Sequence, residues 1–440
     1  MYQAVNFPHS LSDTLPYRDT LTSKMAKTKS ESRSKRKSDS KDILRSNNAP
    51  LVKSAKFKPE KSIEELLTEA AELLERSQPE DALALADEAL QRLEAEKEST
   101  GDIDALLSQA EAGKPTIPPA LVLNAEIHLA LGDVDQARSH FLRATNVDLD
   151  GALISAEPWL WLAQLCEEGG RKSIEFFSKA AEVMRNEIDV LEDTEAMAVE
   201  GNQKILDGRK AKLADALCGM AEVYMTDLSW EADAENVCEQ LVTEAVAVCP
   251  EQLSAGALQT LASVRISQDR VDDARQALKR SMEIWKDLPP DTQDDARPDF
   301  ATRVSLARLL MEVDVEKEAM NVLEGLVKED DQSVEAWYLG GWCQTLMAEE
   351  ESDEEEKHKH LEQAKLWLDS CLKLYKKIEY EDERLHDHAS ELVATMNKEL
   401  GVKDGEDEDW EDEEEEMLDD DDEVEIDGQE VEDDGDVEMA

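Results

Sequence analysis

The stretch that decides the fold is Ala120–Asp150, ALVLNAEIHLALGDVDQARSHFLRATNVDLD, in which small and apolar residues recur every three or four positions. This spacing places them on one face of a helix, and Leu131-Gly132-Asp133 interrupts the pattern as a turn does. Ala125 before the turn and Ala137 after it lie 12 residues apart. Small side chains let two helices approach closely, while the large Phe141 fills the groove beside them. The stretch therefore predicts an antiparallel helix pair.

The same arrangement repeats along the chain. The 12-residue step recurs from Ala262 to Ala274 and from Ala307 to Ala319. The pattern resembles the tetratricopeptide repeat, a helix–turn–helix unit of about 34 residues. Several pairs in the same register argue against a non-repetitive helical bundle. We therefore expect an all-α, superhelical tetratricopeptide-repeat solenoid of about seven helix pairs, with units near 63–96, 118–151, 156–187, 214–252, 255–288, 300–333 and 334–377.

Some segments depart from a regular repeat. An insertion at 188–213 separates the third and fourth units, and Asp227–Ala234 lengthens the fourth. An acidic loop, Glu349–Glu356, is expected inside the seventh unit. The segment 380–399 is expected to be the polar-backed capping helix that solenoids require, with an apolar face made of Leu385, Ala389, Leu392 and Met396.

The charge is distributed unevenly. The 440 residues include 105 Asp+Glu against 48 Lys+Arg, a net charge of −57. Residues 1–60 are basic, residues 401–440 are polyacidic, and residues 61–400 are acidic as well. Both ends lack apolar periodicity, so we expect disordered tails on either side of a solenoid domain at 61–400. An acidic body repels nucleic acid and anionic membranes and attracts basic proteins, so neither nucleic acid nor a membrane is an expected direct partner.

Residues that carry chemistry are not arranged as in an enzyme. The sequence contains no phosphate-binding loop, nucleophile elbow or zinc-ligand cluster, so we predict a non-enzyme without a cofactor. The six cysteines are scattered and are interpreted as small buried hydrophobes. His358-x-His360 and His386-x-His388 are the only paired histidines, and we interpret them as exposed polar residues rather than metal ligands.

The resemblance to tetratricopeptide repeats implies a concave wall lined by the first helix of each unit. Carboxylates on this wall would orient Lys and Arg side chains through charge-assisted hydrogen bonds, and aromatic rings would stack on their stems. The alternative is that these are ordinary solvated helix faces and that Trp342 packs inside the seventh unit. The predicted wall comprises Glu126, Glu157, Glu167, Glu168, Asp215, Glu222, Glu312, Glu335, Tyr338 and Trp342.

The basic N-terminal tail contains a cluster of cations, Lys35-Arg36-Lys37. A short Lys/Arg cluster in a flexible, Ser-rich segment is typical of a nuclear import signal, with an import receptor as partner. The alternative is that the basic tail folds back onto the acidic body. Met25 is a second candidate for the true start of the chain.

A basic tail, about seven repeats and a polyacidic end together resemble the eukaryotic assembly chaperones of large-subunit ribosomal protein four. Ala120–Asp150, Glu157–Met184 and Trp337–Gly341 carry the resemblance. It implies capture of a newly made basic client, protection of the client's rRNA-binding loop, shuttling between cytoplasm and nucleus, and delivery to the pre-60S particle. The charges agree with this role, because an acidic cradle replaces the phosphates that a ribosomal protein lacks before assembly.

Two other functions stay open at this point. An acidic histone chaperone would have the same electrostatics and the same import signal. A non-chaperone scaffold of a regulatory complex would bind its partners even at high salt, because its acidity would be incidental.

Overall fold

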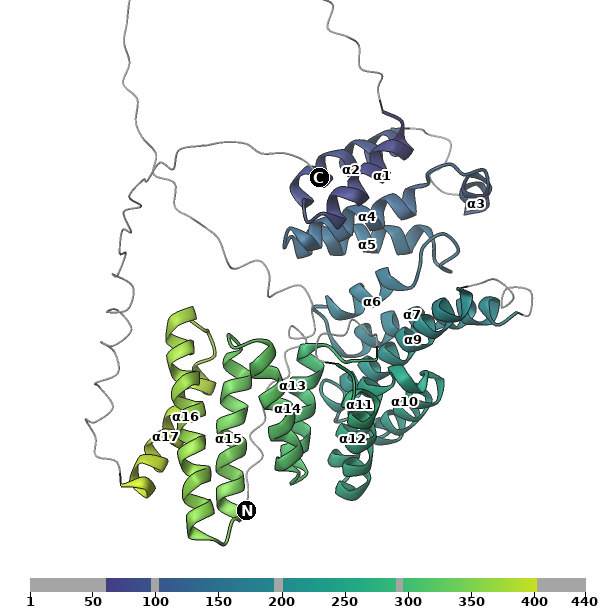
Figure 1. Ribbon diagram of the computed structural model, residues 1–440. Helices are drawn as coiled ribbons and strands as arrows, with labels where there is room; N and C mark the ends of the chain where they lie inside the picture. Colours follow the sequence, from purple (N-terminus) through teal and green to yellow (C-terminus); the bar gives the residue numbers. More distant parts are fainter. Residues whose placement is uncertain (1–60, 96–102, 194–200, 290–295, 402–440) are drawn as a thin grey trace, which may run out of the picture. The chain divides into compact units, whose positions relative to one another are not determined.

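The computed structural model describes residues 61–95, 103–193, 201–289 and 296–401, and this part of the chain is helical without a strand (Figure 1). Helices alternate as first and second members of successive pairs. The first members are α1 (Ile63–Glu75), α4 (Ile117–Ala130), α6 (Glu157–Gln164), α9 (Asn202–Met225), α11 (Ala255–Ser267), α13 (Phe300–Glu312) and α15 (Val334–Glu350). The second members are α2 (Pro79–Ala95), α5 (Val134–Val147), α7 (Gly170–Leu191), α10 (Ala234–Val248), α12 (Val271–Trp285), α14 (Glu316–Glu329) and α16 (Glu354–Ile378). The expected tetratricopeptide-repeat fold is confirmed.

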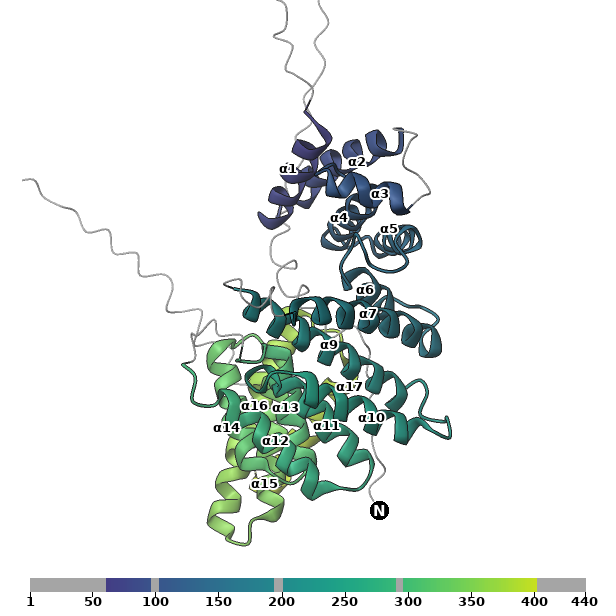
Figure 2. The ribbon, with the colours of Figure 1, turned by 90° about the vertical axis from the view of Figure 1, so that its right-hand side faces the viewer.

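The chain divides into two compact units, one ending at Val315 and the other beginning at Glu316. In the first unit, α1, α4, α6, α9 and α11 each pack on their own second helix and on a helix of the neighbouring pair, as the order of α6, α7, α9 and α10 in Figure 2 shows. One apolar core runs through these pairs, from Leu90 of α2 to Val264 of α11. In the second unit, α15 packs on α14 and α16, and α17 (Glu383–Leu400) covers α16 and part of α15. The expected capping helix is therefore present.

Tight turns between paired helices share one backbone feature. Ser77, Gly132, Asp269 and Asp314 each have a φ between 57° and 78°, the left-handed conformation that ends a helix. The residue after each turn donates its backbone N–H to a carbonyl five residues earlier, as Asp133 does to His128 at 2.9 Å. The regular turn sets the same offset between first and second helices, which is the origin of the 12-residue step.

Small residues lie where the helices approach most closely. Ala125, Ala137, Ala262 and Ala274 are all fully buried, as the step predicts. Among the described glycines the most crowded is in the second unit, where a Cβ added to Gly340 would lie 2.0 Å from Cε3 of Trp367. Only glycine leaves space for that ring, so α15 and α16 pack backbone against side chain at this point.

The structure corrects three details of the predicted organisation. The described residues of the expected insertion at 188–213 belong mostly to helices, because α7 extends to Leu191 and α9 already begins at Asn202. The acidic loop expected at Glu349–Glu356 is limited to residues 351–353, because flanking acidic residues continue α15 and begin α16. An additional helix, α3 (Ile103–Glu111), lies between the first two pairs. Both predicted tails, including Lys35, Arg36 and Lys37, lie outside the described residues except for Gly401.

Candidate client-binding surface

Six of the predicted carboxylates lie on first helices. Glu126 belongs to α4, Glu157 is the first residue of α6, and Asp215 and Glu222 lie two turns apart on α9. Glu312 ends α13 in the first unit, and Glu335 lies in the first turn of α15 in the second unit. The repeat register thus places these six side chains on the expected helices.

Four of these carboxylates form two interacting pairs, Glu126 with Glu157 on α4 and α6, and Asp215 with Glu222 on α9. Burial raises the pKa of Glu126, and the charge of Glu157 raises it further. Burial likewise raises the pKa of Glu222, with a contribution from Asp215. Glu157 connects the two halves, because it forms an ion pair with Lys212, whose charge also acts on Asp215. We call Glu126, Glu157, Asp215 and Glu222 the acidic row.

The centre of the acidic row is accessible and yet closely surrounded by protein. Burial raises the pKa of Asp215 to about 6, Lys212 opposes this rise, and the charge of Asp299 adds to it. Asp215 and Glu222 are nevertheless exposed to solvent. Water therefore reaches both side chains, while neighbouring protein raises their pKa. Cations that approach them interact more strongly than at a fully hydrated carboxylate, because less water screens the charge.

Sequence reasoning missed Lys212, a basic residue within the acidic row. Lys212 precedes Asp215 by three residues on α9 and pairs with Glu157 of α6. The spacing of three residues is a signal for neighbouring side chains on one helix, and it could have revealed the Lys212–Asp215 neighbourhood. The cross-helix contact with Glu157, 55 residues away, has no local signature in the sequence.

The prediction that Glu167 and Glu168 lie on a first helix is wrong. Helix α6 ends at Gln164, and both residues lie in the turn before α7, where they are exposed. Glu167 pairs with Arg138 of the second helix α5, with 2.8 Å between its Oε1 and the arginine Nη1. The short α6 has only eight residues, so the average repeat length overestimated how far this helix extends.

The prediction of an open aromatic surface at Tyr338 is also wrong. Tyr338 is only 5% exposed, and its hydroxyl lies 2.7 Å from Nδ1 of His388 on α17. The partly buried Trp342 packs edge-on against the same histidine, with ring centroids 5.4 Å apart. The alternative that Trp342 packs within the seventh repeat is closer to the structure. These two rings belong to the contact between α15 and its cap.

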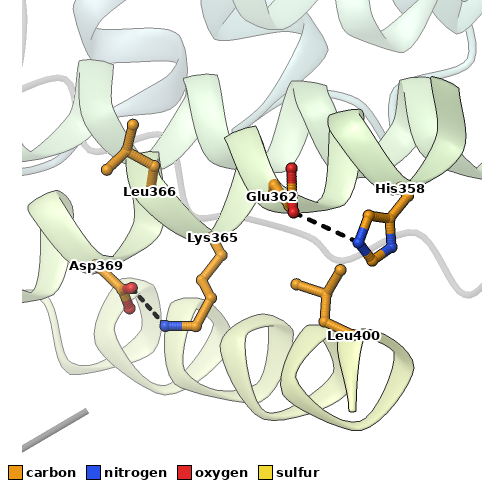
Figure 3. Close-up of a pocket in the computed structure, with 6 residues that line it drawn as sticks. All are labelled: His358, Glu362, Lys365, Leu366, Asp369 and Leu400. Carbon is orange, nitrogen blue, oxygen red and sulfur yellow. Dashed lines mark hydrogen bonds and ion pairs between the residues drawn. The ribbon is translucent and has the colours of Figure 1, made fainter. Parts of the chain in front are cut away.

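The histidines singled out in the sequence contact other side chains rather than one another. His360 Nδ1 lies 2.7 Å from Oε1 of Gln344, and His358 pairs with Glu362 at 3.4 Å. Figure 3 shows His358 and Glu362 in a pocket of about 310 Å³ where α16 faces α17. Lys365 and Asp369, 2.8 Å apart, form a second ion pair in this pocket. The polar side chains that line it thus form two pairs, His358 with Glu362 and Lys365 with Asp369.

The cysteines have the character of core residues. All six are free thiols, and five are buried. Burial raises the pKa of Cys249, Cys343 and Cys371 to about 12, so these sulfurs stay protonated. A protonated, buried thiol is a poor nucleophile and a poor metal ligand.

Paired helices in this register, with carboxylates along their first members, define a tetratricopeptide-repeat protein with an acidic face. Among the described helices, none is both long and apolar enough to cross a membrane. No protein-family model matches the chain.

Comparison with known proteins identifies the family within this class. The chain is 42% identical over 397 residues to "Probable assembly chaperone of rpl4" of Emericella nidulans, which covers 82% of this chain and 95% of the relative. It is 36% identical over 307 residues to the Schizosaccharomyces pombe protein of the same name, with coverage of 66% and 85%. A solved structure, "Assembly Chaperone of RpL4 (Acl4) (Residues 1-338)", is 41% identical, with a TM-score of 0.58 and coverage of 66% of this chain and 98% of that one. The chain belongs to the family of assembly chaperones of rpl4.

Proposed function

We propose that this protein is a dedicated chaperone of newly made ribosomal protein L4 of the large subunit. In this proposal the acidic row and the neighbouring first helices hold a basic segment of the client, including its rRNA-binding loop. The complex then enters the nucleus and delivers the client to the pre-60S particle. Family membership supports the identity of the client, and the described surface supports the mode of binding. The chain acts by binding alone, without catalysis.

The observation that carries this proposal is the acidic row. Its four carboxylates come from three consecutive first helices, so an extended chain laid across them meets more negative than positive charge, although Lys212 pairs with Glu157. Because Asp215 and Glu222 are closely surrounded by protein, a bound Lys or Arg is partly shielded from water and gains more from each contact. Such charge-assisted hydrogen bonds are roughly twice as strong as neutral ones.

The same electrostatics provide a mechanism of release. The rRNA backbone presents a high density of phosphates and competes for the same Lys and Arg side chains. The client therefore leaves the acidic row when it reaches its site on the ribosome, and no energy source is required.

Reversal of the acidic row tests this mode of binding. We expect Glu126→Lys, Asp215→Lys and Glu222→Lys together to weaken binding of purified L4 by at least about thirtyfold, which corresponds to roughly 2 kcal/mol. The control carries the same change in net charge on second helices, with Glu182→Lys, Glu244→Lys and Glu283→Lys, all at exposed positions. We expect the control to bind within about threefold of the native protein. Equal losses in both variants would show that net charge alone holds the client.

Two further measurements separate this proposal from its alternatives. Native protein is incubated with L4 and, separately, with core histones at increasing salt, and tighter binding of histones would contradict the choice of client. Binding that persists at high salt would contradict the electrostatic mode, because exposed charges are screened beyond about 8 Å already at physiological salt. Deletion of Lys35-Arg36-Lys37 tests nuclear entry, and an unchanged nuclear fraction would exclude this cluster as the import signal.

A further inference from the structure

The loop that lengthens the fourth repeat is anchored to the neighbouring repeat at two points. It joins α9 to α10 over residues 226–233. The carboxylate of Asp227 accepts a hydrogen bond from the backbone N–H of Gly170, at the start of α7, over 2.8 Å. Glu231 pairs with Arg171 of α7 at 2.7 Å, and Leu228 is 4% exposed. Anchoring at both ends fixes the loop against α7.

Between these anchors the loop presents an exposed tryptophan. Trp230 is 79% exposed, more than any other large apolar side chain in the described part of the chain. Its indole N–H donates to the carbonyl of Asp227 over 3.0 Å, which fixes one edge of the ring and leaves the rest of it accessible. Tryptophan is highly buried on average, so a fixed and exposed ring indicates an interaction site for a partner. The loop does not need this ring for its own packing, because Leu228 supplies the buried contact.

The surface around Trp230 carries more negative than positive charge. Glu168, in the adjacent α6–α7 turn, and Asp233 and Glu235 of the loop and α10 are exposed and form no ion pair with described residues. The basic side chains nearby are already compensated, since Arg171 pairs with Glu231 and Lys172 pairs with Glu175. A ligand at Trp230 therefore meets an aromatic face next to exposed carboxylates that form no ion pair with the described residues.

We propose that Trp230, Glu168, Asp233 and Glu235 form a second contact site for the client, which we call the Trp230 edge. This inference rests on the proposed function and adds a site on the helix–helix turns, away from the first-helix row. The site takes a Lys/Arg-rich segment of L4. The indole face accepts the cation and its aliphatic stem, and the carboxylates pair with neighbouring basic side chains. Glu168, which does not belong to a first helix, thereby regains a role in client binding.

Two contact sites hold the client more firmly than one. Once the acidic row has bound one segment, the second contact forms within the same complex and benefits from a high effective concentration. Loss of the Trp230 edge therefore acts mainly on the dissociation rate, and loss of the acidic row weakens the complex further.

Photo-crosslinking tests whether the client reaches this site. Full-length protein with Trp230→p-benzoylphenylalanine is mixed with purified L4 and irradiated, and the crosslinked peptides are identified by mass spectrometry. The control carries the same photoreactive residue at Val190, which is 70% exposed on α7. We expect a crosslink at position 230 to a Lys/Arg-rich segment of L4 and a much weaker one at position 190. No crosslink at 230, or one to an apolar or acidic segment, would overturn the inference.

Substitution of Trp230 measures its contribution. We expect Trp230→Ala to raise the dissociation constant for L4 roughly five- to tenfold, and Trp230→Phe, which keeps the aromatic face, to stay within about twofold. Melting temperatures should match the native value, because the ring is exposed. If native protein binds L4 and Trp230→Ala binds equally well, the Trp230 edge is wrong and the proposed function stands. If native protein does not bind L4, the proposed function fails and this inference fails with it.

Discussion

The carboxylates of α9 and the aromatic rings of α15 both lie on first helices, but they differ in their exposure to solvent. Asp215 and Glu222 stay open to solvent in the first unit. Tyr338 and Trp342 in the second unit are covered by α17, with His388 against both rings. The repeat register therefore defines a face of the protein, and the next packed element decides whether that face can bind a ligand.

The two regions also respond to pH with opposite sign. In the first, the folded pKa of Asp215 is raised to about 6, so protons bind the folded state preferentially. The stabilisation that protonated Asp215 provides is fully present below the unfolded pKa of about 3.9, and it is lost as the pH rises through 6. In the second, burial lowers the pKa of His388. Its contribution is present above the unfolded pKa of about 6.5 and is lost as the pH falls through the lower folded pKa.

The largest effect on stability is expected from a substitution that weakens the packing of the capping helix α17. Met396 of α17 is 1% exposed, and Met396→Ala removes most of the apolar surface that this side chain buries within the second unit. We expect a loss of about 2–4 kcal/mol in the free energy of unfolding of that unit, with faster hydrogen exchange in α17. Leu366→Ala on α16 is the control, because Leu366 is 61% exposed and should change stability by less than about 0.5 kcal/mol. Equal effects of both substitutions would mean that α17 is not held by its apolar face.

A smaller effect is expected at the hydrogen bond between α15 and its cap. Tyr338→Phe removes the hydroxyl that lies 2.7 Å from His388 and should cost about 1 kcal/mol at neutral pH. His388→Gln removes the titrating group, so the loss of stability on acidification below pH 6.5 should become shallower. Denaturant unfolding across this pH range, followed by hydrogen exchange in α17, measures both effects. A native protein whose α17 is equally protected at every pH would contradict the coupling of His388 to the cap.

The smallest effect is expected in the acidic row in the absence of client. Asp215→Asn removes a charge that is costly in the folded state and should raise the free energy of unfolding at neutral pH by less than about 1 kcal/mol, since the side chain reaches water. The gain should disappear below pH 4, where the native aspartate is protonated in both states. Thermal unfolding at several pH values tests this, and Asp189→Asn on α7, at an exposed position, serves as control. A gain that is independent of pH would show that the charge of Asp215 is not its origin.

The sequence by itself determined the helix pairs. The 12-residue step between Ala125 and Ala137, and between Ala262 and Ala274, reflects a constraint that acts over one helix–turn–helix unit. Helical periodicity and a short turn are local properties, so they can be recognised in the sequence without knowledge of the rest of the chain. For the same reason the positions of Glu126, Asp215 and Glu222 on first helices could be predicted. Family resemblance, rather than periodicity, pointed to the client.

Only the tertiary structure decided which of those side chains are exposed to solvent and which contact a partner from another repeat. Tyr338 meets a histidine 50 residues away, Glu157 meets Lys212 from another repeat, and Asp227 fixes its loop to Gly170. Such contacts depend on how one repeat is placed on the next, and repeat spacing carries no information about individual side-chain partners. The exposure of Trp230 has the same origin, because it depends on how the loop packs on the neighbouring helix, and the sequence of the loop alone does not show this packing.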